Sequence, residues 1–131
     1  MLSINSVNSD RALIFSQRVG EIFRVDLKAH ALSASIEVST YTDNDGLNKL
    51  FQELGGSERP WQGKRFWSSL EGEFTLSATC SSLGAVCFTV SLRSLTGTSE
   101  EWSVEAGLET EFGQLTQIAK NSKAFFNAAN T

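Results

Sequence analysis

The sequence is poor in the residues that mark many functional classes. It contains one proline, one histidine and two cysteines in 131 residues. A single histidine argues against most zinc sites, which combine several imidazole or thiolate ligands. Two cysteines do not build a disulfide framework. The glycine-rich motifs that hold phosphate groups are absent, and we expect no cofactor and no metal.

The chain also lacks an excess of positive charge and a long apolar run. Its net charge is −4, which argues against nucleic acid as a partner because non-specific binding needs a basic surface. No stretch approaches the roughly 20 apolar residues of a membrane helix, and the first residues do not resemble a signal peptide. We therefore expect one cytoplasmic domain over residues 1–131, with no membrane partner.

What the sequence does contain is alternation of apolar and polar residues, the pattern of half-buried strands. A short apolar run predicts a first strand at residues 12–16. Alternation predicts five more strands, at residues 19–29, 32–41, 73–79, 85–93 and 101–109. In the first hairpin the apolar faces coincide if Ala29 lies opposite Leu32. That register places Arg24 opposite Glu37, a favourable cross-strand pair, and His30 in the turn.

The second group of strands makes a prediction about the cysteines. A three-residue loop, Ser82–Gly84, with a positive φ at Gly84, joins two of these strands. In that hairpin Cys80 points to the apolar side and Cys87 to the polar side. A disulfide between them is therefore not expected.

Two segments change to a helical period. Apolar residues follow one helical stripe at residues 47–54, after a cap among Asp43, Asn44 and Asp45 and before an end at Gly55 or Gly56. Thr110 is the expected cap of a second helix, whose stripe consists of Phe112, Leu115, Ile118, Ala119, Ser122 and Phe125 or Phe126.

The resulting order is βββ-α-βββ-α. Short connections imply antiparallel pairing. We therefore predict an α+β two-layer sandwich, with one antiparallel sheet of about six strands and two helices on one face. The opposite face is expected to be polar and available to a partner.

The stretch from residue 59 to 78 is the first candidate site, because it interleaves cations with aromatic rings. Its candidates are Trp61, Arg65 and Trp67. Tryptophan and arginine dominate protein-binding hot spots, but the stretch could also stack single-stranded nucleic acid. In a third interpretation the rings close the core under cationic side chains. We expect a short helical turn over residues 67–71, broken at Gly72.

Carboxylates form the second candidate site. Five glutamates lie between residues 100 and 111 with no basic residue among them. Glu105 and Glu109 are predicted to share the polar face with Glu73, and Glu71 lies nearby in sequence. Such side chains could be solvated, could act as an acid–base pair, or could bind a partner with a basic surface. No residue is predicted to be catalytic.

The segment "WQGKRFWSSLEGE" resembles a motif, W-x-G-x-x-x-W-x-S-L-E-G-E, of a small uncharacterised bacterial domain family. The matching positions are Trp61, Gly63, Trp67, Ser69, Leu70, Glu71, Gly72 and Glu73. The resemblance covers roughly residues 40–120 and implies a stand-alone cytosolic bacterial domain. It supplies no catalytic residues.

Three functional hypotheses follow. The first is a non-enzymatic protein-binding module, specifically a toxin-neutralising immunity protein, because small acidic α+β proteins often serve that role. The second is a small-ligand-binding or enzyme domain with a pocket near Trp61 and Trp67. The third is a structural homo-oligomer, such as a homodimer, formed through sheet edges or faces.

Overall fold

The computed structural model describes residues 1–40, 45–94 and 99–127. Within these ranges the chain forms eight strands, two α-helices and one 3-10 turn. These are β1 (Leu2–Asn5), β2 (Ala12–Val19), β3 (Ile22–Ala29), β4 (Leu32–Ser39), α1 (Gly46–Gly55), β5 (Arg65–Ser68), β6 (Phe74–Cys80), β7 (Ala85–Arg93), β8 (Ser103–Glu111), the 3-10 turn Phe112–Gln114 and α2 (Leu115–Asn127).

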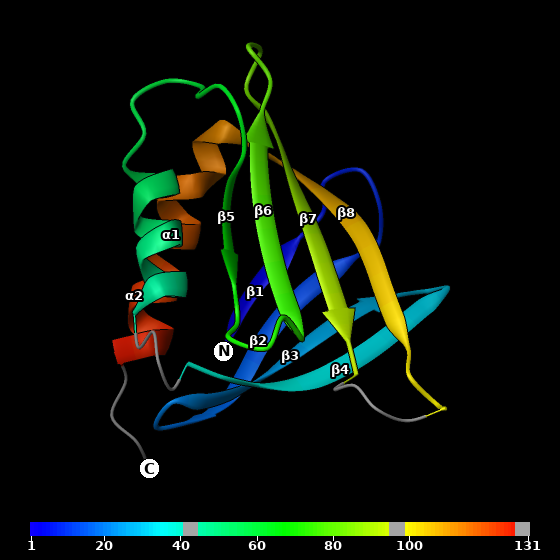
Figure 1. Ribbon diagram of the computed structural model, residues 1–131. Helices are drawn as coiled ribbons and strands as arrows, with labels where there is room; N and C mark the ends of the chain where they lie inside the picture. The colour runs from blue at the N-terminus through cyan, green and yellow to red at the C-terminus, as the bar shows by residue number, and fades with distance from the viewer. Residues whose placement is uncertain (41–44, 95–98, 128–131) are drawn as a thin grey trace.

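The strands form two four-stranded antiparallel sheets (Figure 1). The first sheet has the order β1-β2-β3-β4, the second has the order β5-β6-β7-β8, and a helix follows each. The fold is α+β as predicted, but the prediction of one sheet of about six strands is wrong. The sequence reading missed β1 and β5, each of four residues, because so short a strand shows too little alternation to be recognised.

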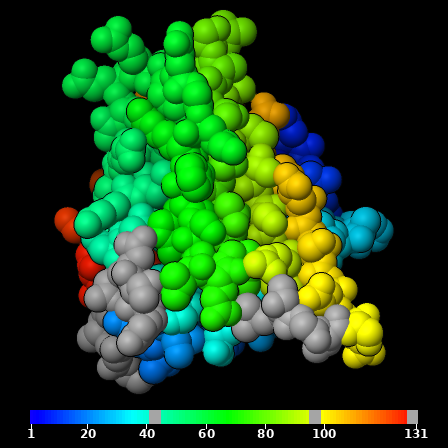
Figure 2. All heavy atoms as spheres, in the orientation of Figure 1, coloured from blue at the N-terminus to red at the C-terminus, as the bar shows by residue number. Residues whose placement is uncertain are grey.

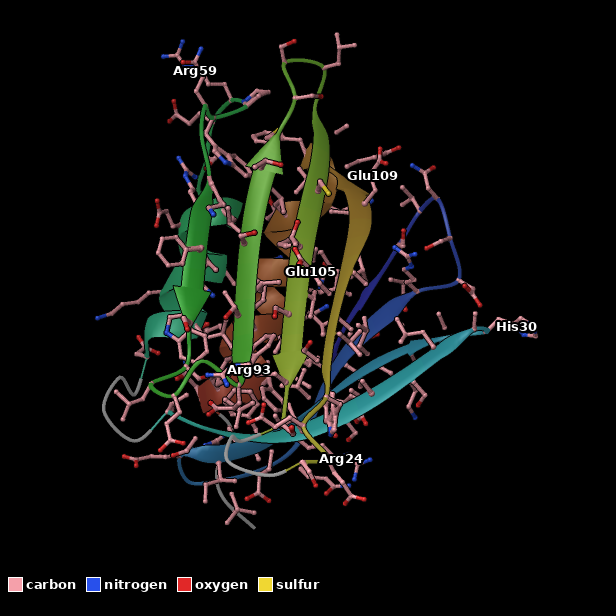
Figure 3. All side chains as sticks on the ribbon, turned by 45° about the vertical axis from the view of Figure 1, so that its right-hand side comes forward. Arg24, His30, Arg59, Arg93, Glu105 and Glu109 are labelled. Carbon is pink, nitrogen blue, oxygen red and sulfur yellow. The ribbon has the colours of Figure 1, made fainter. Side chains whose placement is uncertain are left out.

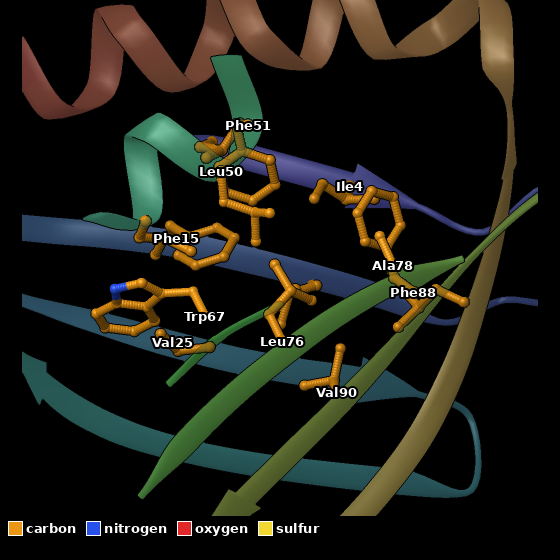
Figure 4. Close-up of a cluster of buried hydrophobic side chains, with 14 of the residues drawn as sticks. Ile4, Phe15, Val25, Leu50, Phe51, Trp67, Leu76, Ala78, Phe88 and Val90 are labelled. Carbon is orange, nitrogen blue, oxygen red and sulfur yellow. The ribbon is translucent and has the colours of Figure 1, made fainter. Parts of the chain in front are cut away.

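The two sheets cross and enclose the core between them (Figures 1 and 4). β1 lies beside β8, and β4 beside β7. The helices pack against each other along one side, α1 against β5 and α2 against β1. Aromatic rings fill the centre, where Phe15 lies 5.8–6.4 Å from the ring centroids of Phe23, Phe51, Phe74 and Phe125. Aliphatic side chains from both sheets, such as Val25 and Val90, complete this core.

The predicted register of the first hairpin is confirmed. Ala29 pairs with Leu32 and Arg24 with Glu37, which leaves His30 in the turn. The ion pair of Arg24 differs from the expectation. Its Nε lies 3.1 Å from Oδ2 of Asp26, two residues along the same strand, because residues i and i+2 share one face of a sheet.

The second hairpin is also as predicted. Gly84 has a φ of +89° in the turn, and Cys80 pairs with Val86 while Cys87 pairs with Thr79. Both cysteines are free.

The helix ends differ from the predictions. Asp45 precedes α1 without a side-chain cap hydrogen bond, and Gly56 follows it in right-handed geometry, with a φ of −88°, so the expected left-handed end is wrong. Asp43 and Asn44 lie outside the described residues. Thr110 does not cap α2, because it is a buried residue of β8 paired with Val86.

The apolar stripes of both helices are as predicted, except that Phe112 is partly buried and lies in the 3-10 turn before α2. Leu47, Leu50, Phe51 and Leu54 of α1 are buried, and so are Leu115, Ile118, Ala119, Ser122 and Phe125 of α2. Neither helix, among the described residues, is long and apolar enough to cross a membrane.

Candidate functional site

The residues predicted to form candidate sites do not form one site. β5 carries Arg65 and Trp67, whereas β8 carries Glu105 and Glu109, and β6 and β7 lie between these strands. The two groups also differ in face. Trp67 points into the core, while Glu105 lies on the solvent side of the sheet (Figure 3).

Trp61 and Arg65 form a structural unit at the β5 edge. The indole is 7% exposed, and its Nε1 donates to the carbonyl oxygen of Ala78 at 3.4 Å. The Arg65 guanidinium carbon lies 4.7 Å from the ring centroid. Arg65 also donates to Ser57 Oγ at 2.7 Å and pairs with Glu53 at 3.4 Å. Its contacts therefore attach the loop after α1 to the sheet and cover the indole.

Trp67, Glu71 and Glu73 lie in or beside the turn between β5 and β6. The Trp67 ring is also 7% exposed and lies 6.0 Å from that of Phe74. Because Trp67 belongs to β5, the predicted helical turn over residues 67–71 is wrong. Gly72 turns the chain with a φ of +73°, as a residue without a Cβ can.

Arg93 holds this turn through main-chain contacts. Its guanidinium donates to the carbonyl oxygens of Gly72, at 3.1 Å, and Glu71, and its amide donates to that of Glu73 at 3.0 Å. The Glu71 side chain is exposed, whereas Glu73 is 7% exposed. The two carboxylates are thus placed in different environments.

The two carboxylates of β8, Glu105 and Glu109, also differ in their exposure to solvent. Glu105 is exposed and lies opposite Ser91. Glu109 is half-buried, its Oε2 accepts from Nδ2 of Asn8, and its carbonyl oxygen accepts from the amide of Val7 at 2.8 Å. Glu109 thus joins the β1–β2 loop to β8, and Glu105 is left as the accessible carboxylate of this pair.

The outer face of the second sheet is a continuous surface of small hydroxyl side chains. We define this hydroxyl face by Phe66, Ser68, Thr75, Ser77, Thr89, Ser91 and Glu105. The register aligns Ser68, Thr75, Ser91 and Glu105 in one row across four strands, beside a second row of Phe66, Ser77 and Thr89. In the described structure no helix covers this face, which is turned toward the viewer in Figure 2.

Phe66 is the unusual member of the hydroxyl face. It is 63% exposed, and Nζ of Lys64 lies 5.7 Å from its ring centroid. The sequence reading did not select Phe66, although it lies between Arg65 and Trp67. Recognition of β5 would have identified it, because a residue next to a buried tryptophan in a strand points to the opposite face.

Comparison with family models gives a match to a family of unknown function, DUF6228, over residues 5–129. The chain belongs to DUF6228. This match confirms the resemblance to an uncharacterised family, while bacterial origin remains a prediction. No curated protein and no solved structure matches the chain.

Three of the cavities that described residues line are formed without Trp61 or Trp67. The largest of these three, about 260 Å³, lies where β1, β8 and α2 meet, and amide side chains such as Gln117 and Asn121 line it. The other two lie near the β2–β3 turn. In the described ranges, no cluster of three or more His, Cys, Asp or Glu residues could hold a metal ion.

The outer face of the first sheet contains a buried charge. Asp26 is 6% exposed, and the Nε of Arg24 donates to both of its oxygens, at 3.2 and 3.1 Å. Burial raises the pKa of Asp26, but hydrogen bonds from Arg24 and Ser35 and the charges of Arg24 and Lys28 outweigh it. The pKa therefore lies below its ordinary value, and the carboxylate is ionised at neutral pH.

The two thiols of the DUF6228 chain also differ. Cys80 is half-buried, and burial raises the pKa of its thiol, an effect that a backbone hydrogen bond involving Trp61 opposes without cancelling. Cys87 is exposed on the outer side of β7.

Proposed function

We propose that this chain is a non-enzymatic protein-binding module whose hydroxyl face binds a partner with a basic surface. The observation that carries the proposal is the exposure of Phe66, 63%, at the edge of a sheet face that is otherwise small and polar. An exposed aromatic ring beside small side chains is a typical hot spot, since it offers a large contact area at little cost in conformational entropy.

Charge supports a basic partner. Glu105 extends from the hydroxyl face into solvent, and the nearby Arg93 guanidinium is occupied by two carbonyl oxygens. The chain as a whole carries a net charge of −4. Complementary charge steers association and rejects acidic partners.

A ligand pocket near Trp61 and Trp67 has less support. Both rings are buried, and Trp61 is covered by Arg65 on one side and packs on Phe112, with ring centroids 6.5 Å apart. The space in which a ligand would contact the Trp61 ring is therefore filled by side chains of this chain.

The proposal is tested by site-specific photo-crosslinking in cells of the native host. A benzophenone amino acid replaces Ser68, which is exposed on the hydroxyl face, or Ser16, on the outer face of the first sheet. We expect a defined cross-linked partner from position 68 and none from position 16. Equal products from both positions would contradict the proposal.

Variants at the hydroxyl face provide the second half of this test. Phe66→Ser and Glu105→Lys are each expected to abolish the cross-link, and a hot-spot truncation costs about 2 kcal/mol or more of binding energy. The matched control is Leu83→Ser, because Leu83 is 96% exposed but lies in the β6–β7 loop, away from the hydroxyl face. A cross-link that survives both face variants would overturn the proposal.

The narrower hypothesis, that the partner is a secreted toxin, belongs to the same proposal. If it holds, the chain restores growth to cells that express the toxin encoded beside its gene, and Phe66→Ser removes this protection. Binding without protection would retain the module and exclude neutralisation.

A further inference from the structure

The two sheets formed by the described residues have four edges, and three of these edges are covered or very short. At β8, the amide of Val7 donates to the carbonyl oxygen of Glu109, and Nη1 of Arg11 donates to that of Gly107, both at 2.8 Å. β1 and β5 are four residues long, and α2 and α1 pack against them. Covered or very short edges are two ways in which proteins prevent sheets from pairing with other chains.

The fourth edge, β4, is long and open among the described residues. It has eight residues and a strand neighbour, β3, on one side only. It contains no lysine, no proline and no bulge, and its one charged residue is Glu37. β4 therefore lacks most of the features that block an exposed edge.

The geometry of the hairpin shows which main-chain groups this edge presents. A two-residue turn joins Ala29 to Leu32, so these two form a hydrogen-bonded pair. Thr40 continues the alternation, because its amide donates to the carbonyl oxygen of Glu21 at 2.8 Å. The N–H and C=O groups in between, at Ser33, Ser35 and Glu37, point away from β3.

We propose that β4 pairs antiparallel with β4 of a second copy of this chain, with Ser35 opposite Ser35 on the two-fold axis. The pairing joins two four-stranded sheets into one of eight strands. Side chains alternate along a strand, so the apolar sides of the two copies coincide only if even-numbered residues lie opposite even-numbered residues, as they do in this register. A register centred on Glu37 would instead place two carboxylates opposite each other.

Charge complementarity selects the register centred on Ser35. It places Ser33 opposite Glu37 of the second copy, and Ser33 is itself opposite Lys28 in β3. The small serine allows the ammonium group of Lys28 to approach the carboxylate of the second copy. By symmetry the same pair forms twice, once at each end of the shared strand pair.

The apolar side chains of β4 also match those of β4 in the second copy. Leu32 and Ile36 are partly buried against the core. In this register Leu32 lies opposite Val38 of the second copy, and Ile36 opposite Ala34. The second copy thus covers the apolar surface that β4 leaves in water, which favours a copy of this chain over an unrelated peptide.

Cysteine cross-linking tests the register. In a background with Cys80→Ser and Cys87→Ser, we expect Ser35→Cys to form a disulfide-linked dimer under mild oxidation. Opposed residues of a hydrogen-bonded pair are about 5.5 Å apart at Cα, which is within disulfide range. The matched control is Ser33→Cys. In the proposed register the two copies of residue 33 are four positions apart along the strands, which is about 13 Å. Cross-linking at position 33 but not 35, or at neither, would overturn the proposal.

The molar mass in solution tests the association itself. The wild type is expected to have twice the 14.3 kDa mass of one chain in light scattering, and Ser35→Lys is expected to be a monomer. Because Ser35 also hydrogen-bonds the buried Asp26, a circular dichroism spectrum like that of the wild type is required to show that this variant is folded. Thr79→Lys, on an exposed residue of β6, is the control and is expected to leave the dimer intact.

A wild type that is monomeric at every concentration would overturn the proposal, and so would a dimeric Ser35→Lys. In the monomeric case, cross-linking from position 35 to another protein would indicate an extended peptide as the occupant of β4. The Phe66→Ser variant separates this proposal from the proposed function, since it is expected to lose the heterologous partner and to keep the dimer.

Discussion

Gly55 of α1 lies directly against Ala119 of α2. A Cβ atom on Gly55 would be 2.5 Å from that of Ala119 and 2.9 Å from the carbonyl oxygen of Leu115, closer than van der Waals contact allows. The two helices can therefore approach only because position 55 has no side chain. This contact positions both helices along the open side of the crossed sheets.

We predict that Gly55→Ala destabilises the protein by about 1–3 kcal/mol, the usual cost of overpacking a core. Urea denaturation measures the change. Gly113→Ala is the matched control, since a Cβ there meets no atom within 4 Å, and it is expected to be neutral. An equally stable Gly55→Ala would show that the helices separate without cost.

A polar network joins the same helices. Ser122, 0% exposed, donates to Oδ1 of Asn48 at 2.7 Å, and Nε2 of Gln52 donates to the same oxygen at 3.1 Å. In Ser122→Ala the Asn48 oxygen still accepts from Gln52, so we expect the free energy of unfolding to fall by only about 1 kcal/mol. Asn48→Ala removes the acceptor of a buried hydroxyl and is expected to cost about 2–3 kcal/mol. A double-mutant cycle measures the coupling, and additive effects would show that the two side chains do not interact.

Asp26 gives a prediction about pH. Its pKa is lower in the folded protein than in the unfolded chain, so its ionised form stabilises the fold above the unfolded value of about 3.9. That contribution is lost as the pH falls through the folded pKa. Asp26→Asn is expected to be less stable than wild type at pH 7, with the difference shrinking below about pH 4. Denaturation midpoints at the two pH values check this, and a pH-independent difference would contradict it.

The thiols are predicted to react in a fixed order. Cys87 is exposed, whereas Cys80 is half-buried, and the raised pKa of Cys80 disfavours its own reactive thiolate form. In native protein, the Cys80→Ser variant should therefore react quickly with a thiol reagent and the Cys87→Ser variant slowly. Equal rates would contradict the difference in exposure between the two thiols.

Much of the local structure could be predicted from the sequence. The hairpin register around Ala29 and Leu32 followed from alternation alone, because a slip of one residue would have exposed the apolar side of both strands. The buried stripes of α1 and α2 followed from the helical period. The number of sheets could not be predicted, since β1 and β5 are too short to show a period.

The candidate site was harder to predict than the fold. Trp61 and Trp67 were conspicuous in composition, yet both serve the core. Phe66, the exposed ring on which the proposed function rests, lies in the same stretch but was not among the predicted binding residues. Sequence shows that aromatic residues are present, but the face to which each one points depends on whether its segment is a strand.

The sequence by itself determined which residues are apolar and with what period, and therefore each hairpin, each helical stripe and the separation of the two cysteines. These are local properties, since they depend on side chains a few positions apart. Only the tertiary structure decided that the strands divide into two crossed sheets, that the β1–β2 loop covers β8 and that β3 is the one described strand paired with β4. Those outcomes depend on contacts such as Val7 with Glu109, about a hundred positions apart, and no local pattern encodes which distant segments meet.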